Sequence, residues 1–210
     1  LEARGEQLYV NLCYVDFGAS AFEHYNDPNE YAEFVLAAYQ HMQSKYGFVP
    51  NALEVVLEPD NTPWNGTLLG QAMTATITKL QAAGFTPRFI VPSTTSMASA
   101  SAYFDAAKNV LGAANVSQYV EELSYHRYTG VSSGALQNIV TRANQYGIRT
   151  SMTEWIGADA NVLHEDLKVA NNSAWTQFAL AFPGGFDDGS IYYPVNGTTV
   201  SVGNLTKQLR

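Results

Sequence analysis

Residues 52–91, ALEVVLEPDNTPWNGTLLGQAMTATITKLQAAGFTPRFIV, contain the pattern that decides the fold class. The apolar run Ala52–Leu57 predicts a buried strand, and Pro87–Val91 predicts a second one. The residues between them predict a helix that begins near Thr67 and ends at Gly84. Its apolar residues recur every three or four positions, as Leu69, Met73, Ile77 and Leu80. A strand, a helix and a second strand in this order are typical of a βαβ unit with parallel strands.

The same alternation continues in both directions along the chain. Four further strands are predicted at Gln7–Phe17, Val120–Tyr125, Ile148–Thr153 and Ser190–Tyr193. A turn at Asn196-Gly197 and a short strand at Thr198–Val202 follow the last of these, and residues 205–210 resemble the first turn of a helix. We count six βα units without a linker between them, which predicts a single domain over residues 1–210.

Four more helices are predicted between these strands. The first begins at Asp27, ends near Gly47 and places Phe34, Val35, Ala38 and Met42 on one face. The second covers Ala98–Leu111, and the third presents Leu136, Ile139, Val140 and Ala143. The fourth passes through Trp175, Phe178 and Phe182, whose spacing predicts a core position for Trp175.

Two α/β architectures fit six such units, an open doubly wound sheet and most of an eight-stranded barrel. The nucleotide-binding form of the open sheet has a glycine-rich turn after its first strand. The corresponding turn here, Asp16–Ser20, contains one glycine and no phosphate-binding pattern. We therefore predict a TIM-barrel-like fold, although 210 residues fall short of the roughly 250 that are typical of a complete barrel.

Composition narrows the class of partner. The formal charge of −8 argues against nucleic acid or an anionic membrane, and it fits a neutral substrate such as a sugar. No apolar run is long enough to span a membrane. The single cysteine, Cys13, excludes an internal disulfide framework, and no histidine spacing indicates a metal site, so we expect neither a metal nor a cofactor. Leu1–Gly5 lacks the apolar core of a signal peptide. A mature secreted protein would also lack it, so the sequence leaves the cellular location of the protein open.

Polar residues gather where the predicted strands end, which is where parallel α/β folds place their chemistry. Two of them, Glu58 and Glu154, each follow a strongly apolar strand, a setting that raises a carboxyl pKa. The 96 positions between them give 32 for each of three βα units, so both side chains are expected at one mouth of the barrel. Paired carboxylates are what glycosidic bond cleavage requires.

These motifs resemble the retaining glycoside hydrolases of the (β/α)8-barrel clan. Val56-Leu57-Glu58-Pro59-Asp60-Asn61 is similar to the clan's acid/base motif at the end of strand 4, and Ser151-Met152-Thr153-Glu154-Trp155 is similar to its nucleophile motif at the end of strand 7. The resemblance implies that Glu58 is the acid/base, that Glu154 is the nucleophile and that the chain corresponds to strands 3–8. The departure is Leu57, where the clan usually has an Asn that binds the sugar 2-hydroxyl.

Seven further residues are candidates for substrate binding. The segment Ser124–Tyr128 looks like the strand 6 region whose His or Tyr contacts the substrate and the nucleophile, and it supplies His126 and Tyr128. Two tryptophans are candidate platforms for a sugar ring, and three polar residues are candidates for hydrogen bonds or the cleft floor: Trp64, Trp155, Asn61, Ser93 and Asp16. Asn61 and Ser93 have helix capping as the alternative role.

The sequence therefore predicts a retaining glycosidase that cleaves β-linked sugars or glucans without a cofactor. Because Leu57 replaces the expected Asn and two strands of the barrel have no counterpart, an alternative is a carbohydrate-binding or assembly protein with weakened or lost catalysis. A doubly wound enzyme acting on another small molecule is the third reading. An incomplete barrel leaves two sheet edges unpaired, so we also expect self-association into a homodimer or larger oligomer through these edges.

Overall fold

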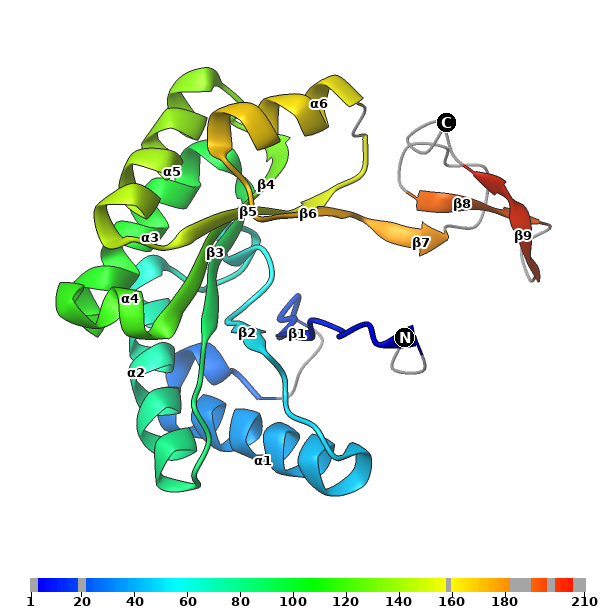
Figure 1. Ribbon diagram of the computed structural model, residues 1–210. Helices are drawn as coiled ribbons and strands as arrows, with labels where there is room; N and C mark the ends of the chain where they lie inside the picture. Colours follow the sequence, from blue (N-terminus) through cyan, green and yellow to red (C-terminus); the bar gives the residue numbers. More distant parts are fainter. Residues whose placement is uncertain (1–3, 19–21, 158–159, 182–189, 196–198, 206–210) are drawn as a thin grey trace.

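The computed structural model describes residues 4–18, 22–157, 160–181, 190–195 and 199–205. Its centre is a six-stranded sheet in which neighbours follow the chain order and every pair is parallel. The strands are β1 (Asn11–Cys13), β2 (Ala52–Glu54), β3 (Phe89–Ser96), β4 (Val120–Thr129), β5 (Arg149–Trp155) and β6 (Ala174–Gln177). Figure 1 shows a curled sheet with α1, α2, α3 and α5 along its outer face. The protein thus has an α/β half-barrel, consistent with an incomplete TIM-like barrel.

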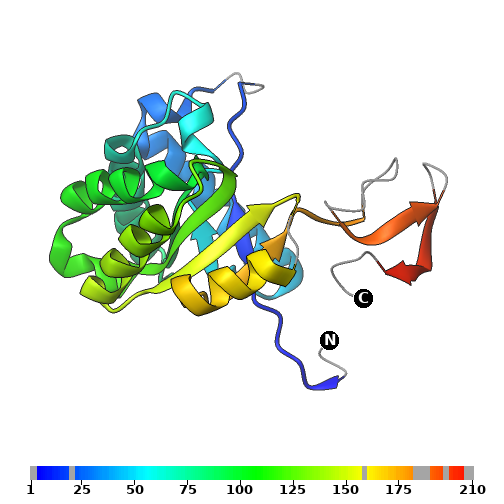
Figure 2. The ribbon, with the colours of Figure 1, turned by 90° about the horizontal axis from the view of Figure 1, so that it is seen from above.

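Helices connect the strands of this sheet. The α-helices are α1 (Pro28–Tyr46), α2 (Gly66–Ala82), α3 (Met97–Leu111), α4 (Val116–Tyr119), α5 (Ser133–Tyr146) and α6 (Ala160–Glu165). Shorter 3-10 segments are η2 (His24–Asn26), η3 (Pro59–Asn61) and η4 (Ala113–Asn115), and η5 (Asp166–Ala170) is a π-helix. A second sheet contains β7 (Ala179–Ala181), β8 (Ser190–Val195) and β9 (Thr199–Leu205), and Figure 2 shows it beyond the end of β6.

Local sequence signals fix the helix ends. The Asp27 carboxylate accepts from two backbone N–H groups in the first turn of α1, and Gly47 ends that helix in the left-handed conformation, with φ of 78°. The Asn65 side chain caps α2. Close packing of α2 on α3 requires Gly66 and Gly70, because a Cβ at either position would lie within 2.6 Å of a carbonyl oxygen of α3. The two helices therefore approach each other backbone to backbone.

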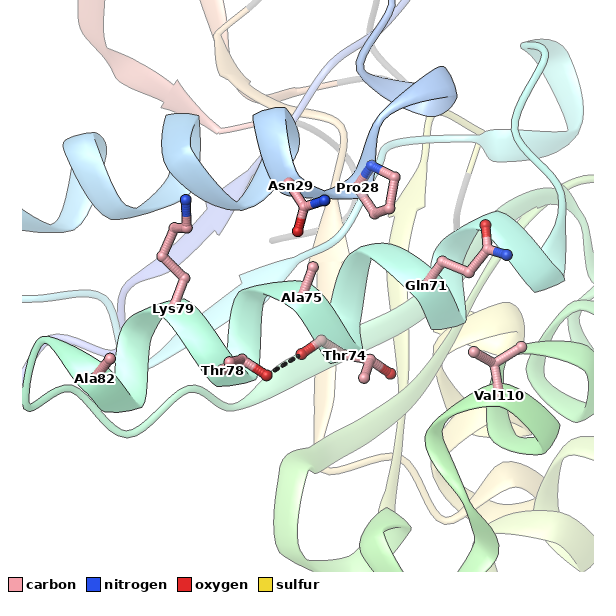
Figure 3. A pocket seen from close by; sticks show the side chains of 9 residues that line it. All are labelled: Pro28, Asn29, Gln71, Thr74, Ala75, Thr78, Lys79, Ala82 and Val110. Atoms are coloured by element: carbon pink, nitrogen blue, oxygen red, sulfur yellow. Dashed lines mark hydrogen bonds between the residues drawn. The ribbon is translucent and has the colours of Figure 1, made fainter.

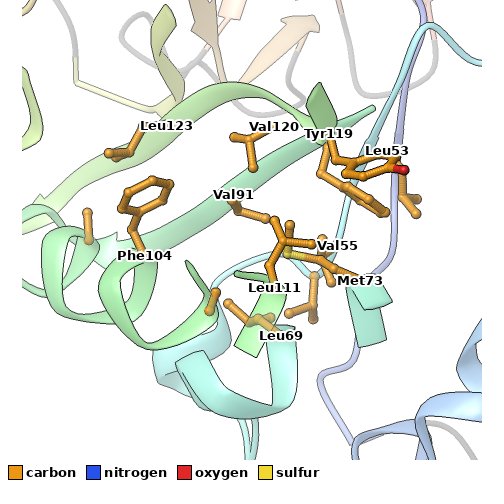
Figure 4. Close-up of a cluster of buried hydrophobic side chains, with 14 of the residues drawn as sticks. Leu53, Val55, Leu69, Met73, Val91, Phe104, Leu111, Tyr119, Val120 and Leu123 are labelled. Carbon is orange, nitrogen blue, oxygen red and sulfur yellow. The ribbon is translucent and has the colours of Figure 1, made fainter. Parts of the chain in front are cut away.

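The main core lies between the sheet and these helices (Figure 4). Apolar residues of the inner strands point outward into it, and the predicted face of α2 meets them there. The cluster includes Leu53, Val55, Val91, Val120 and Leu123 from the strand segments and Leu69, Met73, Phe104 and Leu111 from the helices. Since these side chains occupy the outer face of the sheet, the alternate residues of the same strands face its concave side.

The predicted helix through Trp175, Phe178 and Phe182 is wrong. Ala174–Gln177 is strand β6, paired with β5, and the helical residues come earlier, in α6 and η5. Trp175 packs partly buried against the core from this strand, and its indole N–H donates to the buried Asp166 carboxylate at 3.0 Å. Aromatic and β-branched residues favour strands, and sheet pairing decided between the two patterns. Phe182 lies outside the described residues.

Asp166 connects the last helical segment to the sheet. Besides Trp175, its carboxylate accepts from the Tyr125 hydroxyl at 2.6 Å and from the Arg127 guanidinium at 2.5 Å. Burial raises the pKa of Asp166, while hydrogen bonds from Tyr125 and Trp175 and the charge of Arg127 oppose that rise. Through Asp166, this network connects β6, which pairs with β5, to side chains of β4.

Two other predictions need correction. Phe34 is 50% exposed, because the buried face of α1 consists of Tyr31, Ala32, Val35 and Tyr39 instead. The sixth strand of the parallel sheet is β6, whereas the predicted strand Ser190–Tyr193 belongs to the second sheet as β8 and pairs antiparallel with β9. Leu205 ends β9 rather than starting a helix, and residues 196–198 and 206–210 lie outside the described residues.

Strands β1 and β6 form the two edges of the parallel sheet, and no other described strand extends it at either edge. Self-association through these edges stays a prediction.

Among the described residues, the helices include none with the length and apolar character needed to cross a bilayer.

Candidate active site

Glu58 follows strand β2 at the carboxyl edge of the sheet. The extended chain continues past Glu54, because the Leu57 N–H donates to Tyr14 O at 2.8 Å on one side and the Glu58 N–H donates to Ser93 O at 3.1 Å on the other. Glu58 has a left-handed backbone, with φ of 48° and ψ of 58°, which is uncommon for a non-glycine residue. The chain reverses here into η3, and the side chain is directed to the concave side of the sheet.

Glu154 lies in strand β5, and a register shift places it beside His126. Tyr125 pairs with Met152, but the next residue, His126, pairs with Glu154 instead of Thr153. Such a bulge redirects the side chains that follow it. On β4, the alternate residues Ser124, His126 and Tyr128 contact groups of the site, whereas Leu123 and Tyr125 belong to the core.

Both carboxylates line one hollow. Single ligand atoms of Glu58, His126 and Glu154 lie within 4.8 Å of one another, so the two carboxylates are less than 5 Å apart at their nearest oxygens. The hollow has a volume of about 330 Å³. Its lining residues come from the ends of β1, β2, β3, β4, β5 and β6: Phe17, Leu57, Glu58, Thr95, Tyr128, Glu154 and Phe178. The curl of the sheet brings these six ends together.

Glu58 is held through both carboxylate oxygens. Oε1 lies 2.9 Å from Nδ1 of the fully buried His126, and Oε2 accepts from Asn61 Nδ2 at 3.0 Å. Burial alone raises the pKa of Glu58, but hydrogen bonds from His126, Asn61 and Thr95, together with the charge of His126, outweigh it. The pKa of Glu58 is therefore below its ordinary value.

Glu154 has fewer partners. The Tyr128 hydroxyl donates to its Oε1 at 2.8 Å. Burial raises the pKa of Glu154, the hydrogen bond from Tyr128 and the charge of His126 lower it, and the negative charge of Glu58 raises it further. The net pKa is above the ordinary value. Burial and the neighbouring Glu154 also raise the pKa of Tyr128, so this hydroxyl keeps its proton and stays a donor.

These pKa directions correct one expectation. The apolar strands were expected to raise the pKa of both carboxyls, but only that of Glu154 is raised. The reason is His126, whose Nδ1 contacts Glu58 and whose charge acts on both groups. Glu58 is therefore the more acidic member of the pair.

The other predicted residues have mixed positions. Asn61 contacts Glu58, but Asp16 and Trp64 bond to each other, with Trp64 Nε1 donating to Asp16 Oδ2 at 2.7 Å. The Trp64 side chain is 2% exposed, so its ring faces pack in the core instead of forming a sugar platform. Ser93 is fully buried, bonds to Ser124 Oγ at 2.7 Å and does not line the hollow.

Trp155 lies edge-on against Tyr128, with ring centroids 5.1 Å apart. It is only partly buried, although its indole nitrogen is enclosed without a hydrogen-bond partner. The ring thus supports Tyr128 from the side. It does not line the hollow.

The sequence did not single out three residues that line the hollow, nor the carboxylate that attaches the Glu58 turn to β3. Phe17 and Phe178 flank the hollow from opposite ends of the chain, and Thr95 lies between the β2 and β4 ends. Asp60 accepts from the backbone N–H groups of Thr95 and Ser96. Thr95 and Asp60 stand at predicted strand ends, so their positions carried a signal, whereas Phe178 was placed in a helix.

A larger hollow, of about 710 Å³, lies on the outer face between α1 and α2 (Figure 3). Small and polar side chains line it, among them Asn29, Gln71, Thr74 and Thr78, and its one charged lining residue is Lys79. No carboxylate, histidine or cysteine lines it. Size therefore does not identify the site, and the convergent titratable groups do.

The trio of Glu58, His126 and Glu154 also has the oxygen and nitrogen donors that a divalent metal ion prefers. It is the one such group of three among the residues described by the structure. The contact with Glu58 gives His126 Nδ1 a partner without an ion, whereas His126 Nε2 is buried without a hydrogen-bond partner in the described part of the chain.

Comparisons with known proteins show similarity in the fold. The crystal structure of a conserved exported protein from Bacteroides fragilis superposes with a TM-score of 0.64 at 14% identity, over 93% of this chain and 51% of that one. The catalytic domain of GH30 xylanase C from Talaromyces cellulolyticus superposes with a TM-score of 0.59 at 16% identity, over 86% of this chain and 44% of that one. The chain spans about half the length of these structures. No family model and no curated protein sequence matches it.

Proposed function

We propose that the chain is the core of a retaining glycoside hydrolase that cleaves β-linked sugars or glucans, with Glu154 as nucleophile and Glu58 as acid/base. The observation that carries the proposal is the separation of the two carboxylates, whose nearest oxygens are less than 5 Å apart. Retaining glycosidases have carboxyl groups roughly 5–5.5 Å apart, whereas inverting enzymes need roughly 6.5–9.5 Å to admit a water molecule. The fold shared with a GH30 xylanase domain supports the same class.

The reaction takes two displacements. The Glu154 carboxylate attacks the anomeric carbon as the bond to the leaving oxygen breaks, and the Glu58 proton passes to that oxygen. A water molecule then gives a proton to Glu58 and attacks the anomeric carbon, which releases Glu154. The hydrogen bond from Tyr128 to Oε1 orients Glu154 for attack.

These roles need one proton on the carboxyl pair, located on Glu58. The surroundings lower the pKa of Glu58 and raise that of Glu154. The two groups are close enough to titrate as a pair. Protonation of Glu58 removes the negative charge that raises the pKa of Glu154, and Tyr128 and His126 then hold Glu154 ionised.

The test is hydrolysis of aryl β-glucosides and β-xylosides, with the anomer of the first-formed product followed by NMR. We expect the β-anomer first, and no loss of activity when EDTA is added. The α-anomer as first product would rule out the double displacement. Loss of activity in EDTA that returns with a divalent metal would assign the trio to metal chemistry instead.

Leu57 supports a second candidate, a carbohydrate-binding protein with weakened or lost catalysis. The apolar side chain of Leu57 lines the hollow together with both carboxylates. At this position the retaining glycoside hydrolases that the motifs resemble usually have an Asn that binds the sugar 2-hydroxyl. A hydrogen bond to that hydroxyl strengthens in the transition state. Calorimetric binding of oligosaccharides without turnover of any aryl glycoside would favour this candidate.

A further inference from the structure

Asp60 has no place in the two-carboxylate reaction, yet it connects the Glu58 turn to the next strand. Its carboxylate spans two consecutive backbone N–H groups, with Oδ1 accepting from Thr95 at 2.8 Å and Oδ2 accepting from Ser96 at 3.0 Å. Both donors lie at the end of β3, directly before α3 begins at Met97. A carboxylate is favourable at this place because the helix N-terminus carries partial positive charge.

The residues around Asp60 depend on the same attachment. Asn61 Nδ2 donates both to Glu58 Oε2 at 3.0 Å and to Thr95 Oγ1 at 2.7 Å. Glu58 itself donates its N–H to Ser93 O. Residues 58–61 are thus attached to residues 93–96 at three points, and the central one is Asp60.

The backbone of Glu58 makes this attachment necessary. A left-handed non-glycine residue is unfavourable by about 1–3 kcal/mol and persists only where its surroundings impose it. Ser93, which accepts the Glu58 N–H, is also left-handed, with φ of 52°. Without Asp60, the 3-10 turn loses its two charge-assisted hydrogen bonds to β3, and Glu58 and Asn61 are free to relax together.

We propose that Asp60 is a positioning residue that holds the Glu58 carboxyl in the geometry for proton transfer to the leaving group. This inference rests on the proposed function, because it assigns a role within the same reaction. A positioning residue differs from one that only stabilises the fold. Its loss should slow a substrate more when the leaving group needs a proton from Glu58. In the first displacement, which kcat/KM reports, a leaving group that needs no protonation should therefore be insensitive to the loss of Asp60.

The experiment compares Asp60→Asn, Glu58→Gln and wild type on 2,4-dinitrophenyl and phenyl β-glycosides. General acid catalysis is worth roughly 10²–10⁴-fold, and a misplaced group loses part of it. For Asp60→Asn we expect a fall of about 10–100-fold in kcat/KM, which reports the first displacement, for the phenyl glycoside and less than about threefold for the dinitrophenyl glycoside. Asp60→Glu, which keeps both acceptor oxygens, should restore part of the loss. The conservative variant also serves if Asp60→Asn does not fold.

The matched control is Asp105→Asn on α3, where Asp105 pairs with Arg142 at 2.7 Å, away from the hollow. It should leave both substrates unchanged. Equal losses on both glycosides in Asp60→Asn, or none on either, would overturn the positioning role even if Glu58→Gln discriminates between them. If Glu58→Gln itself shows no discrimination, the acid/base assignment fails, and the role of Asp60 fails with it.

Discussion

The two carboxylates of the site occupy contrasting surroundings. Glu58 lies on a left-handed turn, with both oxygens hydrogen-bonded and the turn attached to β3 by Asp60. Glu154 lies within strand β5, and Tyr128 donates to its Oε1. The pKa of the first is lowered and that of the second is raised. Two glutamates that look alike in the sequence therefore differ in acidity, because of their partners and not because of burial alone.

The substitution with the largest expected effect on turnover is Glu154→Gln. An amide cannot act as the nucleophile, so we expect kcat to fall on the order of 10⁴-fold or more while the fold is retained. The matched control is Glu33→Gln on the outer face of α1, where Glu33 pairs with Lys79. Its turnover should equal that of wild type in the same aryl glycoside assay. Unchanged turnover in Glu154→Gln would end the assignment.

Tyr128→Phe removes the hydrogen-bond partner that the structure gives Glu154 Oε1. A hydrogen bond to a charged group contributes about 1.5–3 kcal/mol, so kcat should fall about 10–100-fold. Because Tyr128 lowers the pKa of Glu154, its loss raises that pKa, and Glu154 ionises only at higher pH. In kcat/KM, Glu154 has the higher pKa of the pair and so sets the alkaline limb, which should move to higher pH while the acidic limb stays in place. A shift of the acidic limb alone would assign Tyr128 to Glu58 instead.

His126→Phe tests the partner that both carboxyls share. His126 lowers the pKa of Glu58 and of Glu154, so its removal should raise both, and the whole bell-shaped profile should move to higher pH. We expect kcat at the new optimum to fall about tenfold or less, since each carboxyl keeps its own role. A profile that stays in place would show that His126 does not set these pKa values. Unfolding curves of the variant serve as the control for structure.

Asp16→Asn tests a residue that the sequence placed in the cleft and the structure places beside Trp64. The change weakens the buried hydrogen bond from Trp64 Nε1, and a hydrogen bond of this kind contributes about 1–3 kcal/mol to the free energy of unfolding. Chemical denaturation should detect that loss, while kcat and KM should stay within about twofold of wild type. A change in KM with unchanged stability would return Asp16 to the substrate site.

Much of the fold was predictable because strands and helices alternate with clear periods. The helix with Leu69, Met73, Ile77 and Leu80 is α2, and all four residues are buried. The segment after Glu154 was not predictable in this way, since Trp175 and Phe178 have helical spacing but lie on or next to a strand. The spacing of residues along the chain does not reveal that Ala174–Gln177 pairs with β5, and this pairing makes the segment a strand.

The site shows the same division. Glu58 and Glu154 were predictable because each ends an apolar strand, and the βα count brought them to one edge. The lowered pKa of Glu58 was not predictable, because it depends on His126, which lies 68 residues away along the chain. The pairing of His126 with Glu154 depends on a register shift between β4 and β5, and no sequence pattern predicts this shift.

The most direct test of the account is covalent trapping of the nucleophile. The protein is incubated with a 2,4-dinitrophenyl 2-deoxy-2-fluoro-β-glycoside, digested and analysed by mass spectrometry. Its reactive leaving group needs no acid, and the fluorine slows hydrolysis of the glycosyl-enzyme. We expect one added 2-fluoroglycosyl group, on the peptide that contains Glu154. A label on Glu58 would reverse the two roles, and no label despite turnover would contradict the double displacement.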